Sequence, residues 1–417
     1  MFLERFRAGI RQFSAVMRRS SPVSTNLLRE FSIPLITGVV VALVWANIEP
    51  ISYRAIVHTP LLGRVTLDFL VNEVFMAFFF GIAVVEITDS LLPGGSLNPP
   101  RKAVTPLLAT AGGVVGPVGV YFLLNAVFGS PALVRGWGIP TATDIALAWL
   151  VARVAFGRTH PAVSFLLLLA IADDAIGLAI IAVFYPDPDH PVSLPPLLLV
   201  AAGMLVVFGL RRFGVRNYWF YLLLGGTAAW VGLYRAHLHP ALALVLIVPF
   251  MPHQRRPPEQ PAFDVREEEH STLSTFEHEW KVVVDFGLLF FGLVNAGVQF
   301  AAVGPATWLV FLSLLVGKTT GIFCFAKAAK YARFPLPAGM TNCDLLLVSM
   351  TAGIGLTVAL FVAGAAFTDP NTQGAAKMGA LGSALIVPLV LLLARFRRSR
   401  SKAILGNGAL TTDPGRG

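Results

Sequence analysis

Hydrophobic residues run along most of the chain in long windows, and polar residues gather in the short stretches between them. Many windows are about 20 residues long and nearly uncharged, which is the length of a helix that crosses the roughly 30 Å hydrocarbon core of a membrane. The pattern predicts an all-α polytopic membrane protein with about 12 transmembrane helices. The predicted spans are 34–50, 67–88, 104–126, 141–156, 162–185, 193–210, 217–234, 238–251, 282–300, 305–326, 342–367 and 375–394.

The composition agrees with this class. Of 417 residues, 55% are hydrophobic and 13% are charged, whereas a soluble domain carries about a quarter charged residues. A dozen such windows are too many to be the buried core of a soluble protein. The two cysteines, Cys324 and Cys343, show neither metal spacing nor a disulfide framework.

The formal net charge of +9 does not indicate nucleic-acid binding, because basic residues also gather on the cytoplasmic side of membrane proteins. An even number of spans places both termini on one side. With that side taken as the cytoplasm, 26 of the 32 lysines and arginines lie inside, five lie outside and Lys318 lies within a span. This bias supports both the span count and cytoplasmic termini.

Three polar segments flank or divide the predicted membrane domain at 32–396. Residues 1–31 form a basic cytoplasmic N-terminal segment with no signal peptide, and we expect either an amphipathic helix on the inner leaflet or a disordered tail. Residues 252–281 form a long polar cytoplasmic loop. Residues 397–417 are expected to be a disordered cytoplasmic tail.

Charged residues inside the spans are few, and one ionised side chain at the bilayer centre costs roughly 2.5–3.5 kcal/mol on insertion scales. Two adjacent aspartates in "AIADDAIG" therefore need compensation. Ion or proton handling is the usual reason, although a polar contact that holds helices together is the alternative. The intramembrane charges are Glu73, Glu86, Asp144, Asp173, Asp174, Asp285 and Lys318.

Successive positions on a helix point about 100° apart, so Asp173 and Asp174 cannot face the same neighbour. One can line a water-filled cavity while the other meets a partner helix, where Lys318 in "LLVGKTTGI" is the obvious partner. Carboxylates that hold either protons or a small hard cation, but not both together, are the physical core of a proton exchanger.

The string "GIPTATDIALAWLVARVAFG" brings Pro140 and the oxygens of Thr141, Thr143 and Asp144 to membrane depth. Such a helix is expected to be broken, as in many transporters that build ion sites from helix ends. Span 11 has a candidate counterpart in "TAGIGLTVALF", whose glycines also suit close helix packing. Asp144 and Lys318 would then neutralise opposite helix ends where the two broken helices cross.

These strings, with "FGLVNAGVQF", resemble the successive signatures of the NhaA-type bacterial sodium/proton antiporters, in the right order from about residue 30 to 395. The resemblance implies an inverted-repeat transporter with broken helices 4 and 11 crossing at mid-membrane. It also implies electrogenic exchange of cytoplasmic Na+ or Li+ for external H+ across the bacterial inner membrane, in sodium and pH homeostasis. A homodimer in the lipid bilayer is implied, and no cofactor is.

Carried over by position, Asp174 is the principal cation-binding carboxylate and Asp173 is the second acid, paired with Lys318 when no sodium is bound. Thr143 and Asp144 match the polar pair of broken helix 4, so Asp174, Asp173 and Thr143 are the candidate ligands of the ion.

Glu86 and His278 match pH-sensing positions, although His278 also reads as an ordinary loop histidine. At the end of helix 2 this chain has "AVVEITDS", which lacks the Lys, Arg and second Glu of the family's run. A shifted or flattened pH dependence is therefore expected.

Three other functions would use some of the same residues. An intramembrane aspartyl protease needs two membrane aspartates, but the contexts "ATD" and "IAD" differ from its motifs and it has no need of Lys318, so no enzyme is expected. A sodium-coupled symporter of an organic anion remains the alternative. A passive channel fits charged, exchangeable side chains less well than alternating occupancy does.

Overall fold

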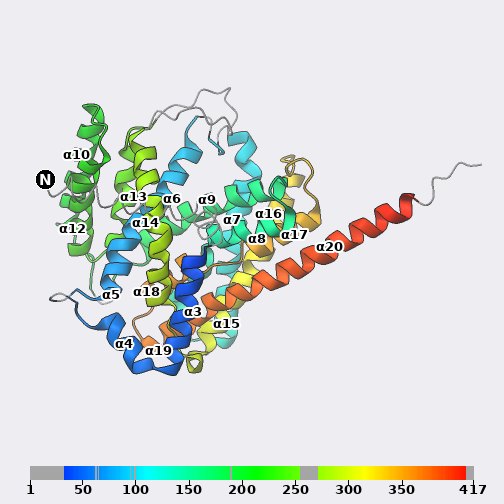
Figure 1. Cartoon of the computed structure of the whole chain (residues 1–417), viewed down its shortest axis with the longest axis horizontal. Helices are drawn as coiled ribbons and strands as arrows, with labels where there is room; N and C mark the ends of the chain where they lie inside the picture. Colours follow the sequence, from blue (N-terminus) through cyan, green and yellow to red (C-terminus); the bar gives the residue numbers. More distant parts are fainter. Residues whose placement is uncertain are drawn as a thin grey trace, which may run out of the picture.

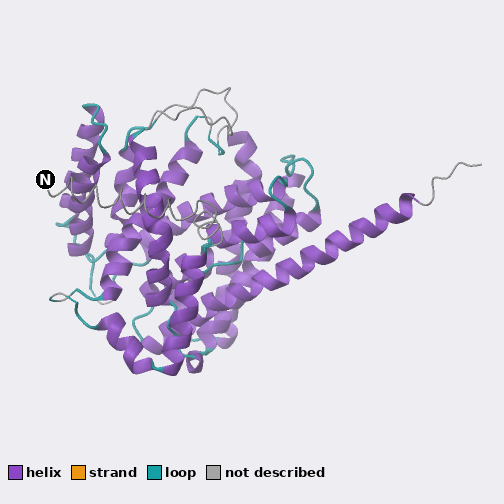
Figure 2. Ribbon diagram, viewed as in Figure 1, coloured by secondary structure: helices purple, strands orange, loops and turns teal. Residues whose placement is uncertain are grey.

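The computed structural model describes residues 32–409 except 62, 64, 94, 98–99, 188–189 and 254–270. The predicted N-terminal segment, most of the polar loop and the last residues of the tail lie outside this range. Helices joined by short loops make up nearly all of the described chain (Figure 2). The prediction of an all-helical protein is confirmed.

Five helices of the described residues are long and apolar enough to cross a membrane: Leu67–Leu91, Ala103–Phe128, Pro161–Phe184, Pro305–Tyr331 and Pro370–Arg397. A sixth span is counted if Pro131–Thr141 and Ile145–Phe156, bent by 54° at the break between them, are taken together. The structure therefore supports a multi-pass membrane protein, while the count of twelve spans stays a prediction.

Shorter helices occupy the remaining apolar windows (Figure 1). The elements of the first part of the chain are α3 (Ile33–Ile48), α4 (Pro50–His58), α5 (Leu67–Phe69), η1 (Leu70–Phe75), α6 (Met76–Leu91), α7 (Pro100–Phe128), η2 (Pro131–Thr141), α8 (Ile145–Phe156), α9 (Pro161–Phe184), α10 (Leu197–Arg212), α11 (Tyr218–Phe220), η3 (Tyr221–Gly226), α12 (Thr227–Arg235), η4 (Pro240–Leu242), α13 (Ala243–Ile247) and η5 (Val248–Phe250). Those of the second part are α14 (Thr272–Asn295), η6 (Phe300–Ala302), α15 (Pro305–Leu312), η7 (Ser313–Lys318), α16 (Thr319–Tyr331), α17 (Asn342–Thr351), α18 (Thr357–Ala366), α19 (Pro370–Gly382), η8 (Ser383–Leu385) and α20 (Ile386–Ala409).

Two helices extend into segments that the sequence predicts to be loop or tail. Helix α14 begins at Thr272, ten residues before the predicted span, because Ser271 caps it by accepting a hydrogen bond from the Ser274 N–H. Helix α20 projects from the body and continues to Ala409, into the predicted tail (Figure 1).

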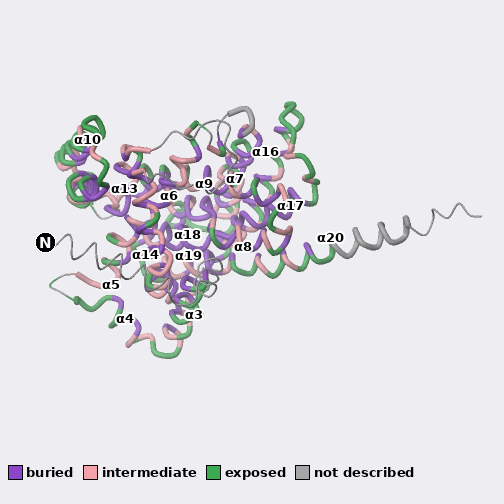
Figure 3. The backbone as a smooth tube through the Cα atoms, turned by 45° about the horizontal axis from the view of Figure 1, so that its top comes forward, coloured by how far each residue is buried: buried purple, intermediate pink, exposed green. Residues whose placement is uncertain are grey.

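The surface of the molecule is apolar where a soluble protein would be charged. Leu198 and Leu205 on α10 are 74% and 71% exposed, which is typical of a lipid-facing helix. Buried residues gather in the middle of the body around α9, α17 and α18 (Figure 3). The interior of this membrane protein is therefore where its few polar side chains must be satisfied.

Two glycine pairs bring α7 into backbone contact with the helix that carries Lys318. Gly112 and Gly116 on α7 face Gly317 and Gly321, and both pairs have the Gly-x-x-x-Gly spacing. A Cβ atom on Gly112 would lie 2.2 Å from the carbonyl oxygen of Gly321, and one on Gly116 would lie 2.3 Å from that of Gly317. We call this contact the glycine seam; it holds the backbone next to Lys318 against α7.

Candidate ion-binding site

The helical run of η2 and α8 is interrupted at residues 142–144, and that of α17 and α18 at residues 352–356. These two interruptions lie against each other. The Thr143 hydroxyl donates to the carbonyl oxygen of Ala352 at 2.8 Å, and the backbone N–H of Asp144 donates to that of Ile354 at 2.8 Å. We call this arrangement the crossing. It satisfies backbone groups that an interrupted helix would leave without partners in a membrane.

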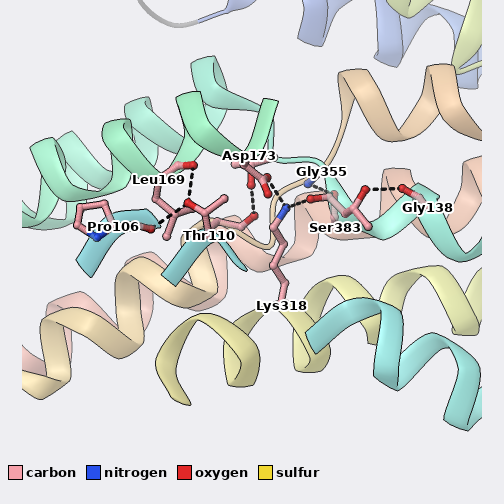
Figure 4. A network of polar contacts seen from close by, with 11 residues as sticks. Pro106, Thr110, Gly138, Leu169, Asp173, Lys318, Gly355 and Ser383 are labelled. Carbon is pink, nitrogen blue, oxygen red and sulfur yellow. Dashed lines mark hydrogen bonds and ion pairs between the residues drawn. The ribbon is translucent and has the colours of Figure 1, made fainter. Parts of the chain in front are cut away.

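Glycine is required where the two segments approach most closely. A Cβ atom on Gly355 would lie 2.8 Å from the carbonyl oxygen of Ala142. The N–H of Gly355 is satisfied from another helix, because the Ser383 hydroxyl oxygen accepts its hydrogen bond at 3.2 Å (Figure 4). The crossing is therefore held by backbone contacts as well as by side chains.

Asp144 lies between the N-terminal ends of two helices. It is the N-cap of α8, where its Oδ1 accepts from the N–H of Leu147 at 3.0 Å. Its Oδ2 accepts from the N–H of Thr357, the first residue of α18, at 3.3 Å. Helix N-termini carry partial positive charge, so a carboxylate is stabilised at this position by both helices.

Lys318 lies at the opposite kind of helix end. It is fully buried, and its Nζ donates to Asp173 Oδ2 at 2.7 Å and to the carbonyl oxygen of Thr141, the last residue of η2, at 2.6 Å (Figure 4). A C-terminal carbonyl carries partial negative charge and favours a cation. Lys318 closes η7, a π-helical turn, and such turns are frequent at functional sites.

The two adjacent aspartates of α9 have different surroundings. Asp173 is fully buried against Lys318, and its carboxylate also faces Thr143. Asp174 is half-buried, and its Oδ1 is buried with no hydrogen-bond partner in the described part of the chain. The Thr110 hydroxyl of α7 donates to the carbonyl oxygen of Leu169 at 3.2 Å, one turn before Asp173 (Figure 4). Helix α9 is thereby held against α7.

The oxygens near this pair are of the kind that a small hard cation prefers. Carboxylate, hydroxyl and backbone carbonyl oxygens suit such ions, whereas transition metals prefer imidazole and thiolate. Within the described residues, no three His, Cys, Asp or Glu side chains form a metal-binding group. The carboxylate oxygens of Asp173 and Asp174 are therefore the candidate ligands of a small hard cation.

Glu86 belongs to a separate cluster between α6 and α14. Its Oε1 accepts from Lys281 Nζ at 3.2 Å, and Lys281 also donates to Glu277 at 3.2 Å, four residues earlier on α14. His278 lies on α14 beside Glu277. Hydropathy alone misses Lys281 because it assigns the residue to a loop. The Glu277–Lys281 spacing is the signal that would have found it.

Apolar helices around a buried ion pair, beside a carboxylate oxygen without a partner among the described residues, define a membrane protein with a buried ionisable site, and such sites mark ion pathways. The chain matches the family described as "Na+/H+ antiporter 1" over residues 28–393. Among its relatives, the Na(+)/H(+) antiporter NhaA of Geobacter metallireducens is 61% identical over 377 residues, covering 90% of this chain and 98% of the relative. The protein of the same name from Geobacter sulfurreducens is 61% identical over 370 residues, covering 89% and 97%. That of Jannaschia sp. is 42% identical over 404 residues, covering 86% and 94%. The chain therefore belongs to the NhaA-type Na+/H+ antiporter family.

Proposed function

We propose that this protein exchanges cytoplasmic Na+ or Li+ for external H+ and that Asp173 and Asp174 bind either the cation or protons. One observation carries the proposal. A buried Lys318–Asp173 ion pair lies beside the crossing, next to an Asp174 oxygen that has no partner among the described residues. Membership of an antiporter family supports Na+ and H+ as the substrates.

The exchange follows from competition for the two carboxylates. In the structure, Lys318 occupies one oxygen of Asp173. A Na+ ion bound by Asp174, Asp173 and Thr143 would displace Lys318 from Asp173, because the ion and the ammonium group require the same negative charge. Protons arriving at the carboxylates would then release the cation and restore the ion pair. More than one proton can be held for each Na+, so the exchange is electrogenic.

The larger architecture belongs to the same proposal. Twelve spans, with an inverted repeat of two helix triplets among them, would place the crossing at mid-membrane, as two broken helices. The strong bias of basic residues supports cytoplasmic termini in a bacterial inner membrane. A homodimer is the proposed assembly. Glu86 and His278 are proposed to set the pH dependence, now together with Lys281.

The test uses everted vesicles from a host that lacks its own antiporters. Respiration acidifies the interior, and a fluorescent pH probe follows the addition of Na+, Li+ or K+. Wild type should alkalinise the interior with Na+ and Li+ but not K+. Asp174→Asn should reduce this response by at least about a hundredfold, because the amide cannot exchange a proton for a cation.

Asp369→Asn is the matched control, since Asp369 is an N-cap of α19 and asparagine also caps helices well. This variant should respond as wild type does. If Asp174→Asn, shown to be folded in the membrane, retained wild-type exchange, the assignment of the carboxylate would be wrong. Family membership does not favour the organic-anion symporter, and a wild type that responds to no cation would reopen it.

A further inference from the structure

Two neighbouring cavities lie at the end of the molecule that the proposed topology turns to the outside. The first, of about 540 Å³, is lined by residues of α4, η1, α14, α18 and α19, which lie together in Figure 1. The second, of about 830 Å³, lies beside it. Glu73 and His239 line both cavities. Glu73 therefore stands where the two spaces meet.

The Glu73 carboxyl group lines both cavities and faces the backbone N–H of Ala241, but it forms no ion pair with a described residue. It lies in η1, a π-helical turn, and its Oε2 is buried with no hydrogen-bond partner among the described residues. The turn is held by helix α12, because the Trp230 indole N–H donates to the carbonyl oxygen of Glu73 at 2.9 Å. A buried carboxylate oxygen without a protein partner is costly, so it must be satisfied from the cavity, by water or by a bound proton or cation.

The charges facing Glu73 make the cavities more favourable for protons than for metal cations. In the first cavity these are Arg54, His58, Asp68 and Lys377, with His239 shared by both. In the second they are Asp187, His190, Arg235 and His237, and Asp187 pairs with His190 at 2.9 Å. A proton needs a single carboxylate oxygen, whereas a metal cation needs several oxygen ligands. Of the other lining carboxylates, Asp68 already accepts from the Asn72 amide and Asp187 pairs with His190, so they leave Glu73 as a site for a proton.

The floor of the first cavity lies one helical turn from the crossing. Phe361 on α18 lines the cavity, and Thr357, four residues earlier, donates to Asp144. Four residues of helix span about 6 Å. Phe361 is nearly fully buried, with the ring of Phe80 edge-on at 5.2 Å and that of His239 at 5.6 Å. An aromatic layer therefore separates the cavity from Asp144.

We propose that Glu73 is the proton-receiving carboxyl group of the outer face, in a cavity closed from the crossing by the Phe80–Phe361 aromatic layer. The inference rests on the proposed Na+/H+ exchange and names the group that serves its external side. A hydronium ion in the cavity gives its proton to Oε2, which leaves water and a neutral carboxylic acid. The acid later returns the proton to water on the path to the aspartates, and the carboxylate is restored.

The test measures Na+ efflux from Na+-loaded, right-side-out vesicles while the external pH is varied. Glu73→Gln should lower efflux about tenfold at an external pH near 8.5, where protons are scarce, and much less near pH 6. Asp68→Asn is the control, because Asp68 lines the same cavity but its carboxylate already accepts from the Asn72 amide at 2.9 Å. This variant should keep the wild-type dependence.

Two results would overturn the inference: a Glu73→Gln variant with the wild-type dependence on external pH, or one with an equal loss at both pH values. These results differ from failure of the exchange proposal. In that case the wild type itself would show no Na+ efflux coupled to external protons.

A second measurement does not depend on transport. Glu73→Cys is made in a protein whose Cys324 and Cys343 are changed to serine, and a membrane-impermeant thiol reagent is added on either side. Labelling is expected from the outside alone. Met76→Cys, three residues further along and fully buried, should stay unlabelled. An unlabelled Glu73→Cys, or labelling from the cytoplasmic side, would contradict the inference.

Discussion

At the scale of single residues, each buried charge of the crossing is met by an opposite charge or by a helix end. Asp144 accepts from the first turns of α8 and α18, and Lys318 lies between Asp173 and the last carbonyl of η2. The scarcity of charges in the apolar windows indicated that one of the two aspartates pairs with Lys318, and the family resemblance assigned that role to Asp173. The sequence could not indicate Thr141, because a backbone carbonyl that binds a lysine leaves no trace in residue type.

Removing one member of the buried ion pair should destabilise the protein strongly. Lys318→Met leaves the Asp173 carboxylate buried with no compensating charge, and a loss of about 3–5 kcal/mol in the free energy of unfolding is expected. Thermal unfolding in detergent measures it.

The double variant Asp173→Asn with Lys318→Met is the control for the ion pair. It should lose less than the sum of the two single variants, by more than about 1 kcal/mol, because the two groups interact directly. Strict additivity would mean that the pair does not contribute as a unit.

At the scale of helices, hydropathy was sufficient to locate the apolar windows and insufficient to locate their ends. Helix α14 begins at Thr272, but hydropathy reads its first turns as loop because they are polar and lead into the cluster with Glu86. The interruption at 142–144 was indicated by Pro140 and Asp144. The sequence left two interpretations open for the interruption at 352–356, because glycines occur both where a helix unwinds and where helices pack closely. In the structure, Gly355 lies in the interruption and also allows the close approach to Ala142.

The glycine seam gives a prediction for the helix that carries Lys318. Gly321→Leu should separate α7 from α16, because a Cβ atom there would lie 2.0 Å from the carbonyl oxygen of Gly112. A destabilisation of about 3 kcal/mol or more is expected from such overpacking, seen as a lower unfolding temperature in detergent.

Gly119→Ala, on the same α7 helix, is the matched control because a Cβ atom there would meet no neighbouring group within 4 Å among the described residues. It should be neutral or slightly stabilising, since alanine favours helix over glycine. Equal effects from the two substitutions would exclude packing at the seam as the cause.

At the scale of the whole molecule, the arrangement of interrupted helices around one buried site depends on contacts between residues more than 200 positions apart. Thr143 meets Ala352, and Asp144 meets Ile354 and Thr357. A single sequence predicts elements by local periodicity and cannot by itself pair segments so distant. The resemblance to a known family supplied that pairing, whereas the hydropathy pattern located only the individual apolar segments.

Topology is testable on the intact chain. With twelve spans and cytoplasmic termini, a reporter that is active only in the cytoplasm should work when fused after residue 396 and fail when fused after residue 369, in the last predicted outside loop. An active reporter at both positions would contradict the predicted last span, 375–394. A reporter fused within 254–270 should be active, which checks that the polar loop after the first eight predicted spans is cytoplasmic.

The glycine seam also has a mechanical consequence. Two backbones in direct contact have no flexible side chains between them that can absorb a displacement, so α7 and α16 are expected to move as one rigid body. Lys318 lies directly before α16, so its backbone cannot move away from α7 without the rest of this rigid body. If the proposed exchange opens Asp174 to the two faces of the membrane in turn, then either α7 and α16 must move together or α9 must bend against them.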